Sequence, residues 1–239
     1  MIRKFVVAAA ALLLVSSFAQ AGIPWTLSNN TRYLAMGDSL TSGLGAIPVT
    51  QGYAYLLYQG SVFDSLTNTS FADAAVPNAK SLDVLDFQVP QAVNLFHPQV
   101  VTLTVGGNDL LEILADPRRE TVLRVLAAFS DNLTQILKEL RENLPHDPKD
   151  ARIIIGNQYE IPDINAVIPQ AHDIITQFNG IIANVAPLYR VQVANVHDAF
   201  QGRNGLLLIE RHGAGASEVH PTNAGYRVMA DAFAAAAAQ

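Results

Sequence analysis

The chain has 239 residues, of which 50% are hydrophobic and 15% are charged, and it contains no cysteine. This length and apolar content predict one compact domain and exclude a disordered chain. The missing cysteine excludes disulfides, thiolate metal sites and a lipid anchored on cysteine. The formal net charge of −6 argues against a protein that binds nucleic acid through its phosphates. An enzyme or a small-ligand binder is favoured.

Residues 1–21 have the pattern of an export signal. Arg3 and Lys4 precede an unbroken apolar run from Phe5 to Val15, and Ala19-Gln20-Ala21 forms an A-x-A cleavage site. The apolar run is shorter than the ~20 residues that a membrane-spanning helix needs. We therefore expect a cleaved signal peptide over 1–21, a mature domain over 22–239, a secreted or periplasmic location of the bacterial type, and no stable membrane anchor.

Short apolar, β-rich segments alternate along the chain with segments of helical period. Three of the five predicted strands are almost wholly apolar, as strands buried on both faces are. One helix is predicted at about 121–144, and another carries an apolar stripe that runs from Ile174 to Leu188. The predicted strands are Tyr33–Met36, Thr69–Val76, Val100–Val105, Arg152–Gly156 and Val191–Val196.

This alternation is typical of right-handed βαβ units, which build a parallel sheet covered by helices on both sides. With five strands, the predicted fold class is α/β, a flavodoxin-like three-layer α/β/α sandwich with a five-stranded parallel sheet. In such a sheet, ligands bind beyond the carboxyl ends of the strands. The residues that follow the strands are therefore the ones to inspect.

Three polar side chains stand where this topology brings loops to one rim. Ser39 follows the first predicted strand, Asn108 follows the third, and His220 opens the last helix. A serine hydroxyl needs a base to become a nucleophile, and the pKa of histidine suits that role. A side-chain amide can donate a hydrogen bond to the developing oxyanion. This set of side chains indicates acyl transfer.

The motifs around these residues resemble those of the SGNH hydrolases, also called GDSL esterases and lipases. Gly37–Leu40 reads GDSL, Gly106–Asp109 reads GGND, and His220-Pro221 precedes Asn223–Tyr226 as in the family's C-terminal block. The segment Ala74–Pro77 is similar to the block that ends the family's second strand. The blocks occur in the family's order over nearly the whole mature chain. No G-x-S-x-G motif of the α/β-hydrolases is present.

The resemblance implies roles for individual residues. Ser39 would be the nucleophile and also an oxyanion donor through its own N–H, Asn108 the side-chain donor, and His220 the base and then the acid. It implies no metal and no organic cofactor. Asp38 would hold the loop after the strand.

Two positions depart from the family's pattern. Asn78 stands where the family has a glycine whose N–H completes the oxyanion hole. Since asparagine tolerates a positive φ, we expect Asn78 to supply this donor. Ser217 stands where the family has the aspartate of its triad. Either Ser217, the neighbouring Glu218 or a backbone carbonyl would then orient His220, and the carbonyl or Ser217 is preferred because Glu218 breaks the spacing by one residue.

Several of these residues also fit simpler roles. Asn108 would alternatively cap a helix over Leu110–Ala115, and Asp109 would cap or neutralise the start of that helix. The apolar stretch Gly52–Leu57 would border the pocket or pack in the core. No metal site is expected, because the remaining histidines lack ligand spacing; they are His97, His146, His172, His197 and His212.

The favoured function is an exported serine esterase that hydrolyses carboxylic esters, resembling lipases, lysophospholipases or acetylesterases, through an acyl-serine intermediate. One alternative is a catalytically weak or inactive ligand-binding protein of the same fold, which Ser217 would explain. Another is an acyltransferase that uses the same site. The expected partner is a small-molecule ester, without nucleic acid. The sequence predicts neither the ester nor the oligomeric state.

Overall fold

A computed structural model describes residues 32–63, 69–144, 151–161, 168, 170–209 and 219–239. Its strands form one sheet in the order β2-β1-β3-β4-β5, and every neighbouring pair is parallel. The predicted five-stranded parallel sheet is therefore confirmed. The strands are β1 (Arg32–Gly37), β2 (Ser70–Asp73), β3 (Val100–Thr104), β4 (Arg152–Gly156) and β5 (Gln192–Ala194).

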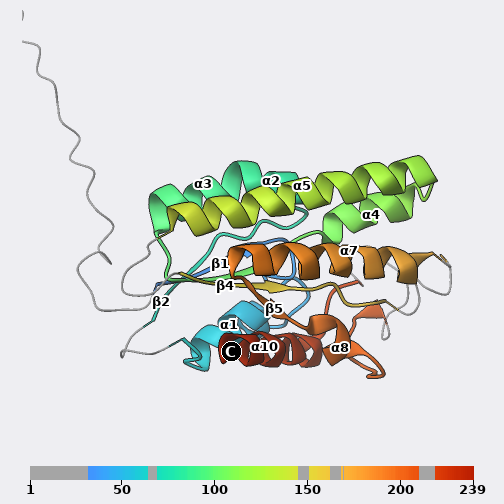
Figure 1. The fold of residues 1–239 in the computed structure, drawn as a ribbon. Coiled ribbons are helices and arrows are strands. Elements are labelled where there is room, and N and C mark those ends of the chain that lie inside the picture. Colours follow the sequence, from blue (N-terminus) through green and yellow to red (C-terminus); the bar gives the residue numbers. More distant parts are fainter. Residues whose placement is uncertain (1–31, 64–68, 145–150, 162–167, 169, 210–218) are drawn as a thin grey trace, which may run out of the picture.

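Helices cover both faces of this sheet (Figure 1), so the three-layer α/β/α sandwich is also confirmed. One face carries α2 (Ser81–Asp83), α3 (Val89–Gln91), α4 (Gly107–Ala115), α5 (Arg119–Asn143) and α7 (Ala171–Val185). The other carries α1 (Tyr53–Gln59), α8 (Val196–Phe200) and α10 (Asn223–Ala237). The 3-10 helices are η2 (Val49–Gln51) and η5 (Ala186–Tyr189), and the π-helices are η3 (Val84–Gln88) and η4 (Ala92–Phe96).

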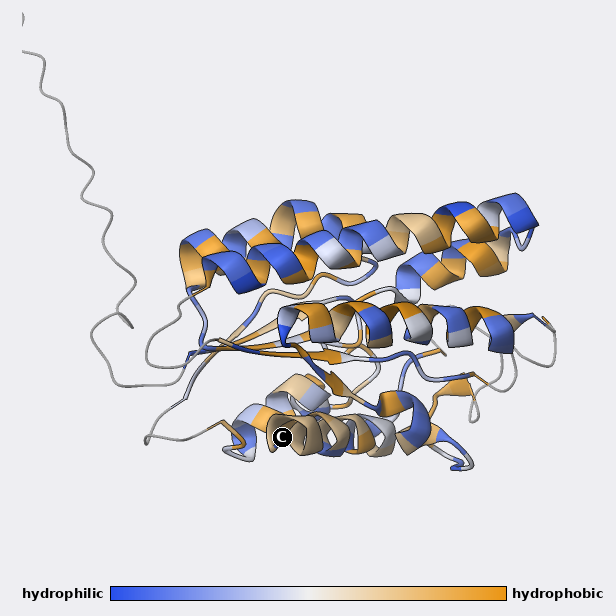
Figure 2. Cartoon of the chain, in the orientation of Figure 1, coloured by the Kyte–Doolittle hydropathy of each residue, from blue (hydrophilic) through white to orange (hydrophobic). Residues whose placement is uncertain are grey.

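The two faces of the sheet build two hydrophobic cores, because successive side chains of a strand point to opposite sides. In β1, Leu34 and Met36 join the core under α5 and α7, whereas Tyr33 and Ala35 join the core under α1 and α10. Along α5, hydrophobic and hydrophilic residues alternate in the ribbon (Figure 2), as expected for a helix with one buried face. This packing fixes β1 and β3 at the centre of the molecule.

Some predicted element ends are wrong for local reasons. The apolar stripe of α7 stops at Val185, and Leu188 is 73% exposed. The chain tightens there into the 3-10 turn η5, whose period of three residues rotates Leu188 away from the core. β5 ends at Ala194 because the Asn195 side chain accepts a hydrogen bond from the Asp198 N–H and caps α8.

The predicted signal peptide, residues 1–21, lies outside the described residues. Within the described ranges, no helix has the length and apolar character that crossing a membrane requires.

Candidate active site

The loop that carries Ser39 begins where β1 ends against β3. Gly37 has φ of 127°, and a Cβ on this residue would lie 1.9 Å from the Thr104 carbonyl oxygen. Only glycine permits this approach of the two backbones. Gln88 holds Gly37 from the other side, since its side-chain amide both accepts from the Gly37 N–H at 2.6 Å and donates to the Gly37 carbonyl at 2.8 Å. The chain therefore turns at a fixed point just before Ser39.

Asp38 stabilises the turn from within. Its Oδ1 accepts hydrogen bonds from the Leu40 N–H at 3.0 Å and from the Thr104 hydroxyl at 2.7 Å. Burial raises the pKa of the Asp38 carboxyl to about 6. These contacts place Asp38 in the position that was expected of it, as a brace of the loop after the strand.

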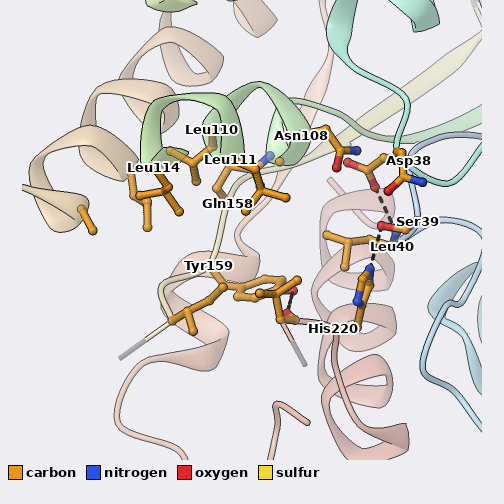
Figure 3. A pocket seen from close by; sticks show the side chains of 16 residues that line it. Asp38, Ser39, Leu40, Asn108, Leu110, Leu111, Leu114, Gln158, Tyr159 and His220 are labelled. Atoms are coloured by element: carbon orange, nitrogen blue, oxygen red, sulfur yellow. Dashed lines mark hydrogen bonds between the residues drawn. The ribbon is translucent and has the colours of Figure 1, made fainter. Parts of the chain in front are cut away.

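Ser39 and His220 meet although they lie 181 positions apart in sequence. The Oγ atom of Ser39 lies 2.8 Å from Nε2 of His220, and both residues are buried (Figure 3). His220 lies just before α10, whose first turn is capped by the Thr222 side chain. A nucleophile and base at this distance have the geometry that general-base activation of a hydroxyl requires.

Asn78 and Asn108 line the same pocket as Ser39 and His220. Asn78 has φ of 68°, in the left-handed region that asparagine tolerates. Asn108 lies in the first turn of α4, and its Nδ2 donates to the Ala79 carbonyl at 2.9 Å. The alternative role of Asn108 as a helix cap is wrong, because α4 starts at Gly107 and its cap position is Gly106.

Asp109 does not occupy the cap position of α4, but it lies in the first turn, where a negative charge is favourable, as was the other expectation for it. Its carboxylate is buried and accepts hydrogen bonds from the Ser81 N–H at 2.9 Å and from the Ser81 hydroxyl at 2.6 Å. Asp109 therefore ties α4, which lines the pocket, to the start of α2, which follows the pocket residue Asn78 by three positions.

The wall of the pocket farther from His220 is apolar. Figure 3 shows Leu110, Leu111 and Leu114 of α4 on this side, facing Tyr159 across the pocket. Ala171 and Ile175 of α7 and Ile161 complete the wall. Gly52–Leu57 does not border the pocket, contrary to one expectation, because Tyr53, Ala54 and Leu57 pack in the core beneath α10.

Several residues that shape the site were missed in the sequence. Gln88 and Thr104 act through hydrogen bonds that join distant segments, and no local sequence pattern predicts such bonds. Gln158 and Tyr159 could have been found from the sequence, because they follow β4 at the carboxyl edge of the sheet.

Ser217 and Glu218 lie outside the described residues. Among the described side chains, no group of three or more His, Asp or Glu residues could hold a metal ion.

Comparison with known proteins places this geometry among enzymes. The sequence profile of the GDSL-like Lipase/Acylhydrolase family matches residues 35–228. The spore germination lipase LipC of Bacillus licheniformis is 27% identical over 217 residues, which are 86% of this chain and 95% of that lipase.

Solved structures agree on the fold. The lipase Lip_vut3 from a goat rumen metagenome aligns with a TM-score of 0.71 and 24% identity over 87% of this chain and 97% of its own. An extracellular lipase from Streptomyces rimosus aligns with a TM-score of 0.63 and 20% identity over 86% of this chain and 99% of its own.

Proposed function

Because the chain belongs to the GDSL-like lipase/acylhydrolase family and is a carboxylic ester hydrolase, we propose that it cleaves esters through a covalent acyl-Ser39 intermediate. The observation that carries this proposal is the 2.8 Å contact between Ser39 Oγ and His220 Nε2. A serine held against an imidazole in an apolar pocket is the arrangement from which acyl transfer starts.

The proposed reaction has two halves. His220 Nε2 takes the Ser39 proton while Oγ attacks the ester carbonyl, and the same imidazolium then protonates the leaving alcohol. Water activated by His220 attacks the acyl-serine, the bond to Oγ breaks, and the proton returns to Ser39. The oxyanion of each tetrahedral intermediate would accept hydrogen bonds from the backbone N–H groups of Ser39 and Asn78 and from the Asn108 amide.

The apolar wall supports an acyl group of several carbons as the preferred substrate. His220 must reach the leaving oxygen, so the alcohol lies on its side of the pocket. Asn108, which would hold the carbonyl oxygen, lies in the first turn of α4, the helix that also carries Leu110, Leu111 and Leu114. The acyl chain would then extend along these leucines toward α7, where each buried CH₂ contributes about 0.8 kcal/mol.

Export is part of the proposal. The positive start, apolar run and A-x-A motif within residues 1–21 support a cleaved signal and a secreted or periplasmic enzyme.

The deciding experiment combines a panel of p-nitrophenyl esters of rising acyl length with a fluorophosphonate probe. Wild-type protein should hydrolyse the esters and carry the probe on Ser39 alone, and Ser39→Ala should lose both properties. Ser42→Ala is the matched control, because Ser42 lies in the same loop and donates its hydroxyl to the Ser39 carbonyl rather than contacting His220. It should still be labelled. Labelling at another residue, or undiminished hydrolysis by Ser39→Ala, would overturn the proposal.

A further inference from the structure

The backbone after His220 is held by pairing with a neighbouring segment. The Leu208 N–H donates to the His220 carbonyl at 2.9 Å, and the Thr222 N–H donates to the Leu206 carbonyl at 2.8 Å. Leu207 and Pro221 form an antiparallel bridge between these two bonds. The chain on the carboxyl side of His220 is therefore held by backbone hydrogen bonds of the kind that join antiparallel strands.

The backbone before His220 is held by a side chain. The hydroxyl of Tyr159 donates a hydrogen bond to the Val219 carbonyl at 2.7 Å, and Figure 3 shows this contact at the edge of the pocket beside His220. The Val219 carbonyl belongs to the peptide unit that leads directly into His220. Its position therefore sets the direction in which the imidazole leaves the backbone.

Tyr159 is itself fixed. Its ring is buried and stacks on Phe200, with 4.8 Å between the ring centroids. The preceding residue, Gln158, donates its side-chain amide to the Val105 carbonyl at 2.8 Å. Asn179 of α7 pairs with the backbone of Gln158, accepting from its N–H at 2.8 Å and donating to its carbonyl at 2.9 Å. The hydroxyl of Tyr159 therefore extends from a segment anchored both to the residue that follows β3 and to α7.

Burial raises the pKa of Tyr159 well above its ordinary value, and the nearby Asp38 charge adds to the effect. The hydroxyl consequently keeps its proton at any pH at which the enzyme would work, and it remains a donor to the Val219 carbonyl.

We propose that Tyr159 is a positioning residue for His220, which holds the imidazole against Ser39 through the hydrogen bond from its hydroxyl to the Val219 carbonyl. The proposal rests on the proposed function, in which His220 is the base. The hydroxyl and the ring of Tyr159 then have separate effects. The hydroxyl fixes the base and acts on kcat, whereas the ring faces the apolar wall across the pocket and acts on the binding of the acyl chain.

The test is Tyr159→Phe, which removes the hydroxyl and keeps the ring. We expect kcat for a hexanoyl ester to fall at least about tenfold, since small misplacements of a reacting group are costly, while KM stays within about twofold of the wild-type value. The rate of fluorophosphonate labelling at Ser39 should fall in parallel. Rates are expressed per Ser39 that can be labelled, so that unfolded protein does not count as a loss of kcat.

Tyr33→Phe is the matched control. Tyr33 is also buried, and its hydroxyl shares a hydrogen bond with the Thr102 hydroxyl at 2.8 Å within the sheet. This variant should lose a similar amount of thermal stability and keep its kcat. Tyr159→Leu, which removes the ring as well, should add a rise in KM for the hexanoyl ester.

The outcomes separate the two proposals. If wild-type Ser39 is not labelled, the proposed function fails and the role of Tyr159 fails with it. If Ser39 is labelled but Tyr159→Phe matches Tyr33→Phe in kcat, or changes KM instead of kcat, the positioning role alone is wrong.

Discussion

The side-chain amide of Asn108 donates a hydrogen bond to the backbone carbonyl of Ala79, at 2.9 Å. Ala79 directly follows Asn78, so this bond ties Asn108 to the residue next to Asn78, the other residue proposed as an oxyanion donor. An amide nitrogen carries two N–H groups. The bond to Ala79 uses one of these N–H groups and fixes the plane of the amide. The direction of the second N–H group is therefore fixed as well.

Asn108→Ala should lower kcat by ~10²–10³, the usual cost of removing one donor from an oxyanion hole. The loss of the bond to Ala79 adds freedom at Asn78. Asn132→Ala is a suitable comparison, because Asn132 donates a similar amide hydrogen bond to Ser81 at 3.0 Å without lining the pocket. Steady-state kinetics on the two variants would check the prediction, and an equal loss in both would contradict it.

Asn78→Gly should retain most of the activity, since the proposed donor is the backbone N–H and glycine adopts a φ of 68° without strain. Asn78→Ala should lose activity and about 1 kcal/mol of stability, because alanine disfavours the left-handed region. Measurements of kcat and thermal unfolding would distinguish these outcomes. A large loss of kcat in the glycine variant would show that the asparagine side chain itself takes part.

Ile175→Ala should reduce the preference for longer acyl groups. The ratio of kcat/KM for a hexanoyl ester to that for an acetyl ester should fall about fivefold to tenfold, since up to three buried carbons of the wall are lost. Ile174 is the matched control, because it is the neighbouring residue on α7, equally buried, and lies outside the pocket lining. If Ile174→Ala changes the ratio equally, the acyl chain does not follow this wall.

Stability should depend on pH through Asp38. Its folded pKa of about 6 lies above the ordinary value, so the folded state binds more protons between about pH 4 and 6. The free energy of unfolding therefore falls as pH rises through this window, by about 3 kcal/mol, and levels off above it. Urea unfolding of wild type and Asp38→Asn at several pH values would measure this difference. Burial also raises the pKa of Asp73 to about 6, but Asp73 is present in both proteins, so its contribution cancels in the difference between them. If the free energy of unfolding varies with pH in the same way in wild type and Asp38→Asn, the prediction is wrong.

Ser217→Asp should raise kcat/KM at pH 7 and raise the apparent pKa of His220, because a nearby negative charge favours the imidazolium. Glu218→Gln tests the competing arrangement. If Glu218 orients the ring, its replacement should cost up to ~10⁴ in rate, and the gain from Ser217→Asp should be small. If a carbonyl or Ser217 does so, Glu218→Gln should change little, and pH–rate profiles of both variants would show which is correct.

The sequence predicted the layers of the fold well, because apolar strands such as β4 and the long stripe of α5 are local patterns. The prediction of the helix end failed at Leu188, because the apolar periodicity continues in the sequence while the backbone changes from an α-helix to a 3-10 turn. The run from α2 to η4 was not predicted as helical, since Pro90 lies within it and two of its segments are π turns.

The pocket was harder to predict than the residues at its centre. Ser39, Asn108 and His220 stand out because their motifs surround the ends of elements. The apolar wall does not stand out, because a leucine facing a pocket and a leucine facing a core look the same in a sequence. The stretch at Tyr53 shows the same ambiguity, since its sequence fitted a pocket border and the core equally, and it lies in the core. Which face of a helix opens to a ligand depends on packing between distant segments.

The separation of 181 positions between Ser39 and His220 also bears on when the enzyme can first act during its synthesis. A ribosome that adds about 5–20 residues per second needs on the order of 10–40 s to extend the chain from the proposed nucleophile to the proposed base. Until then, the strand before Ser39 can pair with β3, but the proposed base, the imidazole of His220, has not yet been made. A nascent chain would therefore remain unable to attack cellular esters until α10 has been made and has packed beneath the sheet.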